Sequence, residues 1–158
     1  MVTRWFNPIG VTQTALVLFL SMLFPLTSSP LVSFAEVMTN ITGAGDLVGT
    51  TVTHTGHLYD IEGGIRPGDG TGHILFHSFG DFSVGQSAGQ ADIANFRNND
   101  SGITTTYIIG RVTGGNPSSI DGIIQTTGFG NANLFLVNPF GIVFGPHGLF
   151  NVGGSVSF

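Results

Sequence analysis

The sequence predicts an all-β solenoid, in which short strands coil into stacked rungs. Asn-Pro pairs recur 22 residues apart, at Asn116-Pro117 and Asn138-Pro139. This spacing lies at the low end of the roughly 20–50-residue periods that mark solenoids. Short Ile, Val and Phe runs separated by Gly surround both pairs, with no helical stretch between them. Only 8% of the residues are charged, so Asn, Ser, Thr and backbone amides must solvate the surface.

Residues 1–35 predict an export signal rather than a segment of the fold. An arginine near the start precedes an apolar run over residues 15–26. That run is too short for the roughly 20 residues of a membrane span and fits a signal h-region of roughly 7–15 residues. Small residues at Ser33 and Ala35 match a cleavage site, so we predict cleavage between Ala35 and Glu36. The alternative is a retained membrane anchor.

The rest of the chain predicts strands and no long helix. Gly recurs every few residues, and each interior Gly costs a helix about 1 kcal/mol relative to Ala. The apolar runs are short, aromatic and β-branched, as strands are. The expected strands cover residues 47–53, 73–76, 81–84, 91–96, 104–112, 120–125, 134–137, 141–144, 149–152 and 155–158. A short helix over residues 92–98 is the alternative to one of them.

The predicted strands divide the mature chain near Gly102. Before it the runs are irregular, and residues 63–72 form a turn-rich loop. After it the strands are regular and the turns compact. A solenoid needs an atypical terminal unit to cover its first rung. We therefore expect residues 36–102 to form an N-terminal cap region and residues 103–158 the first rungs, truncated because the pattern is still running at its end.

Charge and cysteine content exclude some functions. The net charge is −5 and the only fixed cations are four arginines, so no basic stripe exists for nucleic acid. The chain has no Cys, so an exported form must be held together by ladder hydrogen bonds and core burial rather than by disulfides.

Histidines are the strongest candidates for a metal site. His73 and His77 are four residues apart, which puts them on one face of a strand, and Asp60 or Asp81 would complete a site. However, His77 lies within an aromatic run that is typical of a core. We expect neither a metal nor another cofactor.

The carboxylates do not predict an enzyme. Carbohydrate-active β-helices gather several carboxylates on one face. Here only Asp121 falls in the predicted regular rungs. Ser78 follows a histidine, but no Gly-x-Ser-x-Gly elbow surrounds it. The expectation is a protein without catalytic residues.

An ordered set of short motifs runs through the mature chain. It resembles the N-terminal secretion domain, or haemagglutination activity domain, of filamentous haemagglutinin-type exoproteins exported by two-partner secretion, most closely the cyanobacterial versions. The motifs are Leu75-Phe76-His77-Ser78-Phe79, Phe82-Ser83-Val84, Ala94-Asn95-Phe96, Ile108 to Val112, Gly114-Gly115-Asn116-Pro117, Ile120-Asp121-Gly122, Asn138-Pro139-Phe140-Gly141-Ile142-Val143-Phe144-Gly145 and Val152-Gly153-Gly154-Ser155.

The resemblance implies a right-handed, single-stranded parallel β-helix with an N-terminal β cap and no enzymatic activity. It implies export through the periplasm to the medium or cell surface, with the periplasmic domains of an outer-membrane two-partner secretion transporter as partner. Members of the family are adhesins, haemagglutinins or carriers of toxin modules. Glycans or proteins on host or neighbouring cells are the targets that downstream repeats would bind.

The Asn-Pro motifs are the positions that the resemblance assigns to transporter recognition or to structure. Asn can bond its own downstream backbone and Pro fixes φ, so a turn explains these residues physically. The family's second motif commonly has Asn where this chain has Phe140. Two alternatives stay open: a β-helical carbohydrate-binding or carbohydrate-cleaving protein, and a truncated, non-functional relic. The carried-over positions are Asn116, Pro117, Asn138, Pro139, Gly141 and Ile142.

Overall fold

The computed structural model describes residues 38–100 and 102–158, and all regular structure in them is β. No helix within those ranges is long and apolar enough to cross a membrane. The strands are β1 (Asn40–Gly43), β2 (Thr50–Thr55), β3 (Leu58–Gly63), β4 (Ile74–Ser83), β5 (Gln86–Ser87), β6 (Gln90–Ala91), β7 (Ile93–Arg97), β8 (Tyr107–Val112), β9 (Ser118–Ile120), β10 (Ile123–Thr127), β11 (Asn133–Val137), β12 (Ile142–Phe144), β13 (Leu149–Asn151) and β14 (Val156–Ser157).

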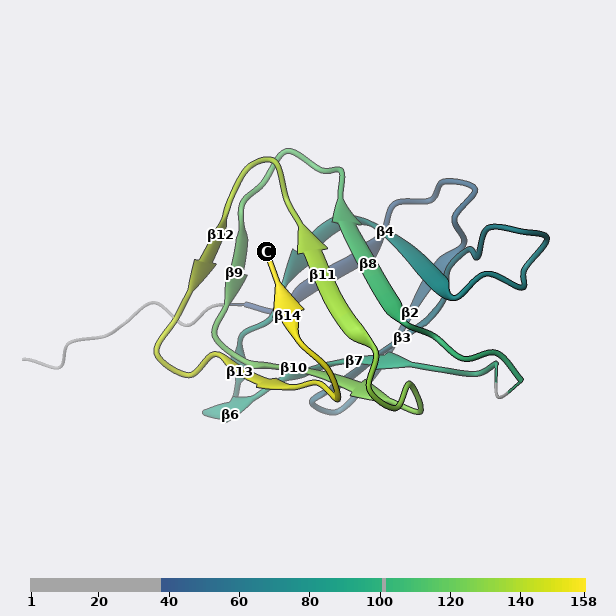
Figure 1. The fold of residues 1–158 in the computed structure, drawn as a ribbon. Coiled ribbons are helices and arrows are strands. Elements are labelled where there is room, and N and C mark those ends of the chain that lie inside the picture. The colour runs from purple at the N-terminus through teal and green to yellow at the C-terminus, as the bar shows by residue number, and fades with distance from the viewer. Residues whose placement is uncertain (1–37, 101) are drawn as a thin grey trace, which may run out of the picture. The chain divides into compact units, whose positions relative to one another are not determined.

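The strands form two five-stranded sheets, a two-stranded third sheet and the short antiparallel pair β5-β6 (Figure 1). The first sheet has the order β1-β4-β8-β11-β14, the second β13-β10-β7-β3-β2, and β9 pairs with β12 in the third. From β3 and β4 onward, every pair within these sheets is parallel. The chain visits the sheets in rotation, as β7, β8, β9 and then β10, β11, β12. The predicted all-β fold of stacked parallel strands is thus confirmed, and it is compatible with a β-helix.

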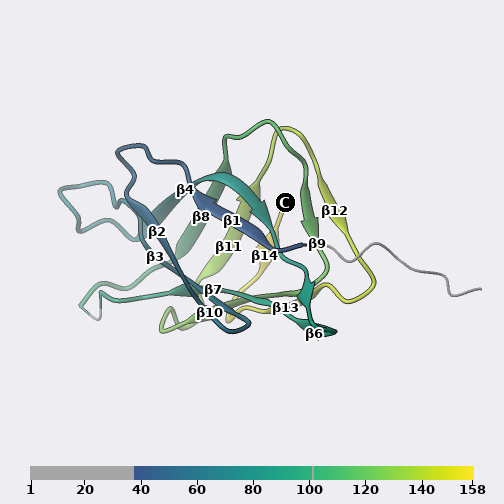
Figure 2. The same cartoon turned by 180° about the vertical axis from the view of Figure 1, so that it is seen from behind.

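The first two strands differ from the rest, because they run antiparallel to their neighbours. β1 pairs with β4 and β2 with β3, and each lies at the outer end of its sheet (Figure 2). The predicted boundary near Gly102 falls between β7 and β8. Parallel pairing of β4 with β8 crosses that boundary, so stacking already includes strands on its N-terminal side.

The core consists of columns of apolar side chains, one from each rung. Leu75, Ile108 and Leu134 occupy equivalent positions on β4, β8 and β11, and all are buried. Phe79, Phe82 and Phe96 fill the interior nearer the N-terminal strands and contact one another through their rings. Each fully buried side chain of this size stabilises the fold by about 1.5–3 kcal/mol, so repeated columns replace disulfides as the source of cohesion.

Several strand predictions need correction. The sequence predicts two strands at 73–76 and 81–84, but β4 runs unbroken through Gly80. A Cβ at Gly80 would lie 2.9 Å from Thr42 Oγ1, so this glycine allows the close approach of β1 rather than ending a strand. β1 and β3 were not predicted at all, and the helical alternative over residues 92–98 is wrong because β7 occupies it.

Candidate functional site

The second Asn-Pro motif is a hydrogen-bonded turn between β11 and β12. Asn138 Oδ1 accepts the backbone N–H of Phe140 at 2.9 Å, and Asn138 O accepts that of Gly141 at 3.0 Å. Its amide Nδ2 donates to Asn116 O and to Ser118 Oγ, both at 2.9 Å. The side chain therefore closes its own turn and ties it to the turn of the preceding rung.

The first motif continues the same column toward the N-terminus. Asn116 Nδ2 donates to Asp81 Oδ1 at 3.0 Å, and Asn40 Nδ2 donates to Asp81 Oδ2 at 3.2 Å. One corner of the stack thus carries Asn40, Asp81, Asn116 and Asn138, which we call the asparagine column. The sequence motifs did not reveal Asp81 and Asn40 because neither precedes Pro; the only sequence signal is that both are polar residues near strand ends.

The other motif positions serve the turns. Pro117 and Pro139 are not buried, and neither supplies a backbone donor at its corner. Gly141 has a φ of 99°, a conformation that favours glycine, and its carbonyl accepts the N–H of Ser118 at 3.0 Å. Ile142 begins β12 opposite Ser118 and packs against the core. The structure therefore assigns these residues turn and packing contacts, and their role in recognition stays a prediction.

The two motif asparagines make unequal contributions to stability. Asn138→Ala removes two donated bonds and one accepted bond from the side chain that links the two turns, and we expect a loss of about 1–3 kcal/mol in the free energy of unfolding. Asn116→Ala removes one bond from an exposed side chain, so a loss within about 0.5 kcal/mol is expected. Urea unfolding of both variants measures the difference; equal losses would contradict this assignment.

A buried carboxylate anchors the start of the described chain. Asp92 is 1% exposed and accepts hydrogen bonds from Thr39 Oγ1 at 2.6 Å, Ser87 Oγ at 2.6 Å and His57 Nδ1 at 2.9 Å. Burial acts to raise the pKa of this carboxyl, but the hydrogen bonds from Ser87, Thr39 and His57, with the charge of His57, outweigh it and lower the pKa. As an anion, Asp92 therefore holds together the segment before β1, the turn between β2 and β3, and strand β5.

Asp121 has a similar role in the following rung. Its Oδ1 accepts the backbone N–H of His147 at 2.8 Å, and Gln86 Nε2 donates to Oδ2 at 3.3 Å. Burial acts to raise its pKa, but the backbone and side-chain bonds of His147 lower it on balance. The sequence predicts Asp121 as the one carboxylate in the regular rungs, but Asp92 lies directly before β7, the strand that pairs with β10. Both carboxylates are occupied by contacts within the fold.

The two candidate metal-binding histidines lie in different surroundings. His73 is exposed and its Nδ1 lies 2.6 Å from Thr104 O, whereas His77 is 2% exposed among Phe79 and Phe96. Asp60 accepts a hydrogen bond from Asn95 Nδ2, and Asp81 accepts one from Asn116 Nδ2 within the asparagine column. Within residues 38–100 and 102–158, no three His, Asp or Glu side chains converge as a metal site would require.

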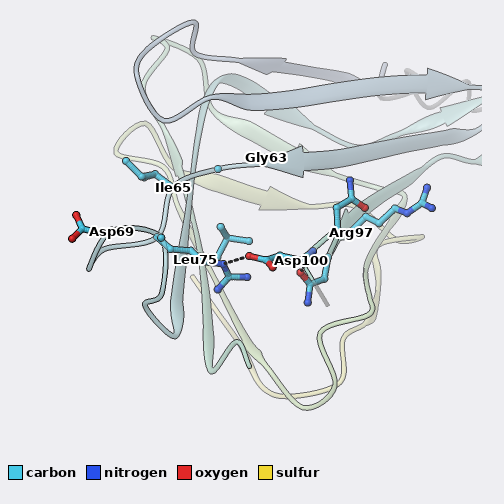
Figure 3. A pocket seen from close by; sticks show the side chains of 11 residues that line it. Gly63, Ile65, Asp69, Leu75, Arg97 and Asp100 are labelled. Atoms are coloured by element: carbon cyan, nitrogen blue, oxygen red, sulfur yellow. Dashed lines mark hydrogen bonds and ion pairs between the residues drawn. The ribbon is translucent and has the colours of Figure 1, made fainter. Parts of the chain in front are cut away.

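One pocket, of about 590 Å³, lies between the glycine-rich loop after β3 and the segment after β7 (Figure 3). Its two arginines pair with acidic neighbours. Arg66 Nε lies 3.8 Å from Asp100 Oδ2, and Arg66 Nη2 donates to Thr105 Oγ1 at 2.8 Å. Arg97 Nη1 lies 3.5 Å from Asp60 Oδ2, and Arg97 Nε lies 3.6 Å from Glu62 Oε1. Both cations thus hold chain segments together rather than pointing at an empty anion site.

Comparison with known proteins identifies the family. A family model described as the TPS (two-partner secretion) secretion domain matches residues 39–157. No curated protein and no solved structure matches the chain. The match spans the asparagine column and both anchored carboxylates, while the predicted cleavage site at Ala35 and Glu36 lies outside the described residues. The cyanobacterial likeness stays a prediction. The resemblance read from the sequence motifs is confirmed at the level of the family, and the chain belongs to the TPS secretion domains.

Proposed function

We propose that this chain is the non-enzymatic secretion-recognition domain of a filamentous haemagglutinin-like adhesin. Membership of the family makes it a component of an exported two-partner secretion exoprotein with a transporter as partner. The family match over residues 39–157 is the observation that carries the proposal. Adhesion to surface glycans or proteins is assigned to segments other than this domain.

A non-enzymatic role is supported by the state of the charged side chains. Asp92 and Asp121 each accept several hydrogen bonds from neighbouring loops. Carboxylates that work as general acids or nucleophiles have to face a substrate instead. The histidine inside the core, His77, is equally removed from any substrate.

The proposed architecture is a right-handed parallel β-helix with an N-terminal β cap made by β1 and β2. Their antiparallel pairing with β4 and β3 supports this role, because the rung they cover would otherwise expose its backbone edge. At the opposite end, Phe144, Phe150 and Phe158 contact one another and are each about half exposed. A further rung stacked there would cover them.

Export in the presence and absence of the partner tests this function. The whole chain is expressed in cells with a candidate outer-membrane transporter of the two-partner class, with a version of that transporter lacking its periplasmic domains, or with neither. We expect the chain in the medium only with the intact transporter and in the periplasm otherwise. Release that is independent of the transporter, or retention in every strain, would contradict the proposal.

A further inference from the structure

Strand β2 lies at the open edge of its sheet, and the hairpin geometry fixes which of its backbone groups point outward. β2 pairs with β3 in unbroken register from Thr50↔Gly63 to Thr55↔Leu58. A two-residue turn joins the strands, with Gly56 at a φ of 60°. The pair that closes such a hairpin exchanges both hydrogen bonds, and bonded pairs then alternate along the ladder.

This alternation directs the backbone N–H and C=O groups of Thr51, Thr53 and Thr55 toward β3. The backbone N–H and C=O groups of Val52 and His54 consequently point away from the hairpin. Two backbone hydrogen bonds outside the ladder agree with this alternation. Gly64 N donates to Gly49 O at 3.3 Å, as the next pair in the series requires. On the far side of β3, His57 O accepts Ile93 N at 2.7 Å, so odd-numbered positions of β3 face β7.

The outward edge of β2 is free among the residues that the structure describes. No other strand pairs with it on that side. No backbone group outside the hairpin bonds to Val52 or His54 in residues 38–100 and 102–158. At the start of the strand, Thr50 O lies close to Gly43 of β1, so the accessible stretch begins at Thr51.

β2 lacks the features that protect strand edges in folded proteins. Natural edges are short, bulged, or carry Lys or Pro. β1, the corresponding outer strand of the other large sheet, has four residues and a shift of register between Ile41 and Gly43. β2 has six residues, a regular register, no proline and no Asp, Glu, Lys or Arg. The strands at the other end, β12 to β14, have only two or three residues each.

We propose that the outward edge of β2, through the backbone groups of Val52 and His54, is where a periplasmic domain of the transporter adds an extended strand. The inference rests on the proposed function, which supplies the partner. Strand addition gives affinity through main-chain bonds. A Thr-rich edge without Asp, Glu, Lys or Arg fits this mode, because no carboxylate, ammonium or guanidinium group is desolvated when the added strand covers it. A six-residue strand is about 20 Å long, the usual length of a paired strand.

Substitution at His54 separates backbone from side-chain recognition. His54→Pro removes an outward N–H while the ladder to β3 stays intact, since proline is tolerated where the N–H of an edge strand faces solvent. His54→Ala is the matched control, because it removes the same imidazole and its stack on Tyr59 but keeps the N–H. Each full-length chain is recovered from the periplasm of cells without transporter. Binding to the immobilised, purified periplasmic domains of the transporter is then measured.

We expect His54→Ala to bind within about twofold of the unaltered chain. We expect His54→Pro to bind at least tenfold more weakly, which corresponds to about 1.4 kcal/mol. Circular dichroism and the thermal midpoint show whether both variants are folded. Equal binding by two folded variants would overturn the inference. If the unaltered chain does not bind the periplasmic domains, this result contradicts the proposed function itself, and not only the assignment of the binding edge to β2.

Amide hydrogen exchange tests the same edge without a substitution. When the unaltered chain is saturated with the periplasmic domains, the N–H groups of Val52 and His54 are expected to become protected at least tenfold. Those of Thr51, Thr53 and Thr55 already bond to β3 and should change little. Binding without protection at Val52 and His54 would place the docking site elsewhere, even where His54→Pro does not fold.

Discussion

Gly122→Ala is expected to destabilise the fold by about 3 kcal/mol, near the upper end of overpacking effects. Gly122 lies at the corner between β9 and β10, and its N–H donates to Val84 O at 3.0 Å. A Cβ there would lie 2.5 Å from Gly85 O, 2.6 Å from Asp92 O and 2.8 Å from Val84 Cγ1. Two of these neighbours are backbone atoms of the preceding rung, so relief requires the rungs to separate.

The consequence extends beyond one contact, because the same corner holds the Asp92 carboxylate. Separating the rungs would loosen the bonds that Thr39, Ser87 and His57 make to it. For a domain of this size, about 3 kcal/mol lowers the thermal midpoint by on the order of 10 °C.

Gly115→Ala is the matched control for this substitution. A Cβ at Gly115 would meet no atom within 4 Å, and its φ lies outside the region that favours glycine. We expect this variant to change the free energy of unfolding by no more than about 0.5 kcal/mol, so its thermal midpoint should stay close to that of the unaltered chain. Similar midpoints for the two variants, measured by circular dichroism, would show that the corner is not closely packed.

Stability should fall by about 3 kcal/mol as the pH drops from 6.5 to 4, because of one core histidine. His77 is 2% exposed, and its Nε2 has no hydrogen-bond partner among the described residues. Burial, with a smaller contribution from the charge of Arg66, lowers the pKa of His77 from 6.5 to about 4. The unfolded chain therefore binds the proton more tightly than the folded one, so acid favours unfolding.

The pH window separates this histidine from the anchored carboxylates. Above pH 6.5, His77 is neutral in both the folded and the unfolded chain and costs no stability. Below pH 6.5 the unfolded chain gains the proton first, and the resulting loss of stability is nearly complete near pH 4. The pKa values of Asp92 and Asp121 lie below the ordinary 3.8, so their contributions are lost only at still lower pH. The lowering of the pKa of His77 from 6.5 to about 4 corresponds to about 3 kcal/mol.

Urea unfolding at a series of pH values measures this dependence. His77→Phe should remove most of the slope between pH 6.5 and 4, whatever its effect on stability at neutral pH. His73→Phe is the control, because it makes the same replacement at an exposed histidine outside the core. An unchanged slope in His77→Phe would mean that another group titrates with folding.

Sequence pattern predicted the stacked strands well where the rungs are regular. The 22-residue spacing of the motifs matches the register of β11 with β14, in which Leu134 pairs with Val156. It does not hold for the neighbouring strands β8 and β11, where the paired residues Ile108 and Leu134 are 26 residues apart, nor in the earlier rungs, where Leu58 pairs with Ile93. Loop lengths differ between rungs, and a fixed period cannot anticipate them. The strand β1 escaped notice because its partner β4 is distant in sequence, and β3 because it follows a Gly-containing turn.

The site could be predicted only to a limited extent. Asn138 was identified from its motif, and its turn has the form expected for an Asn-Pro sequence. Asp81 and Asp92 could not be identified, because most of their partners are distant in sequence: Asn116 is 35 residues from Asp81, and Thr39 is 53 residues from Asp92. The free edge of β2 depends on what fails to pair with it, which is a property of the fold rather than of a motif.

Transfer of export to a short tail tests the central claim most directly. A disordered epitope tail is attached after residues 1–158 or after residues 1–37 alone, and each fusion is produced with and without the transporter. We predict that the tail reaches the medium only when residues 38–158 and the transporter are both present. Equal release of the two fusions, or release without the transporter, would contradict the assignment of secretion recognition to this domain.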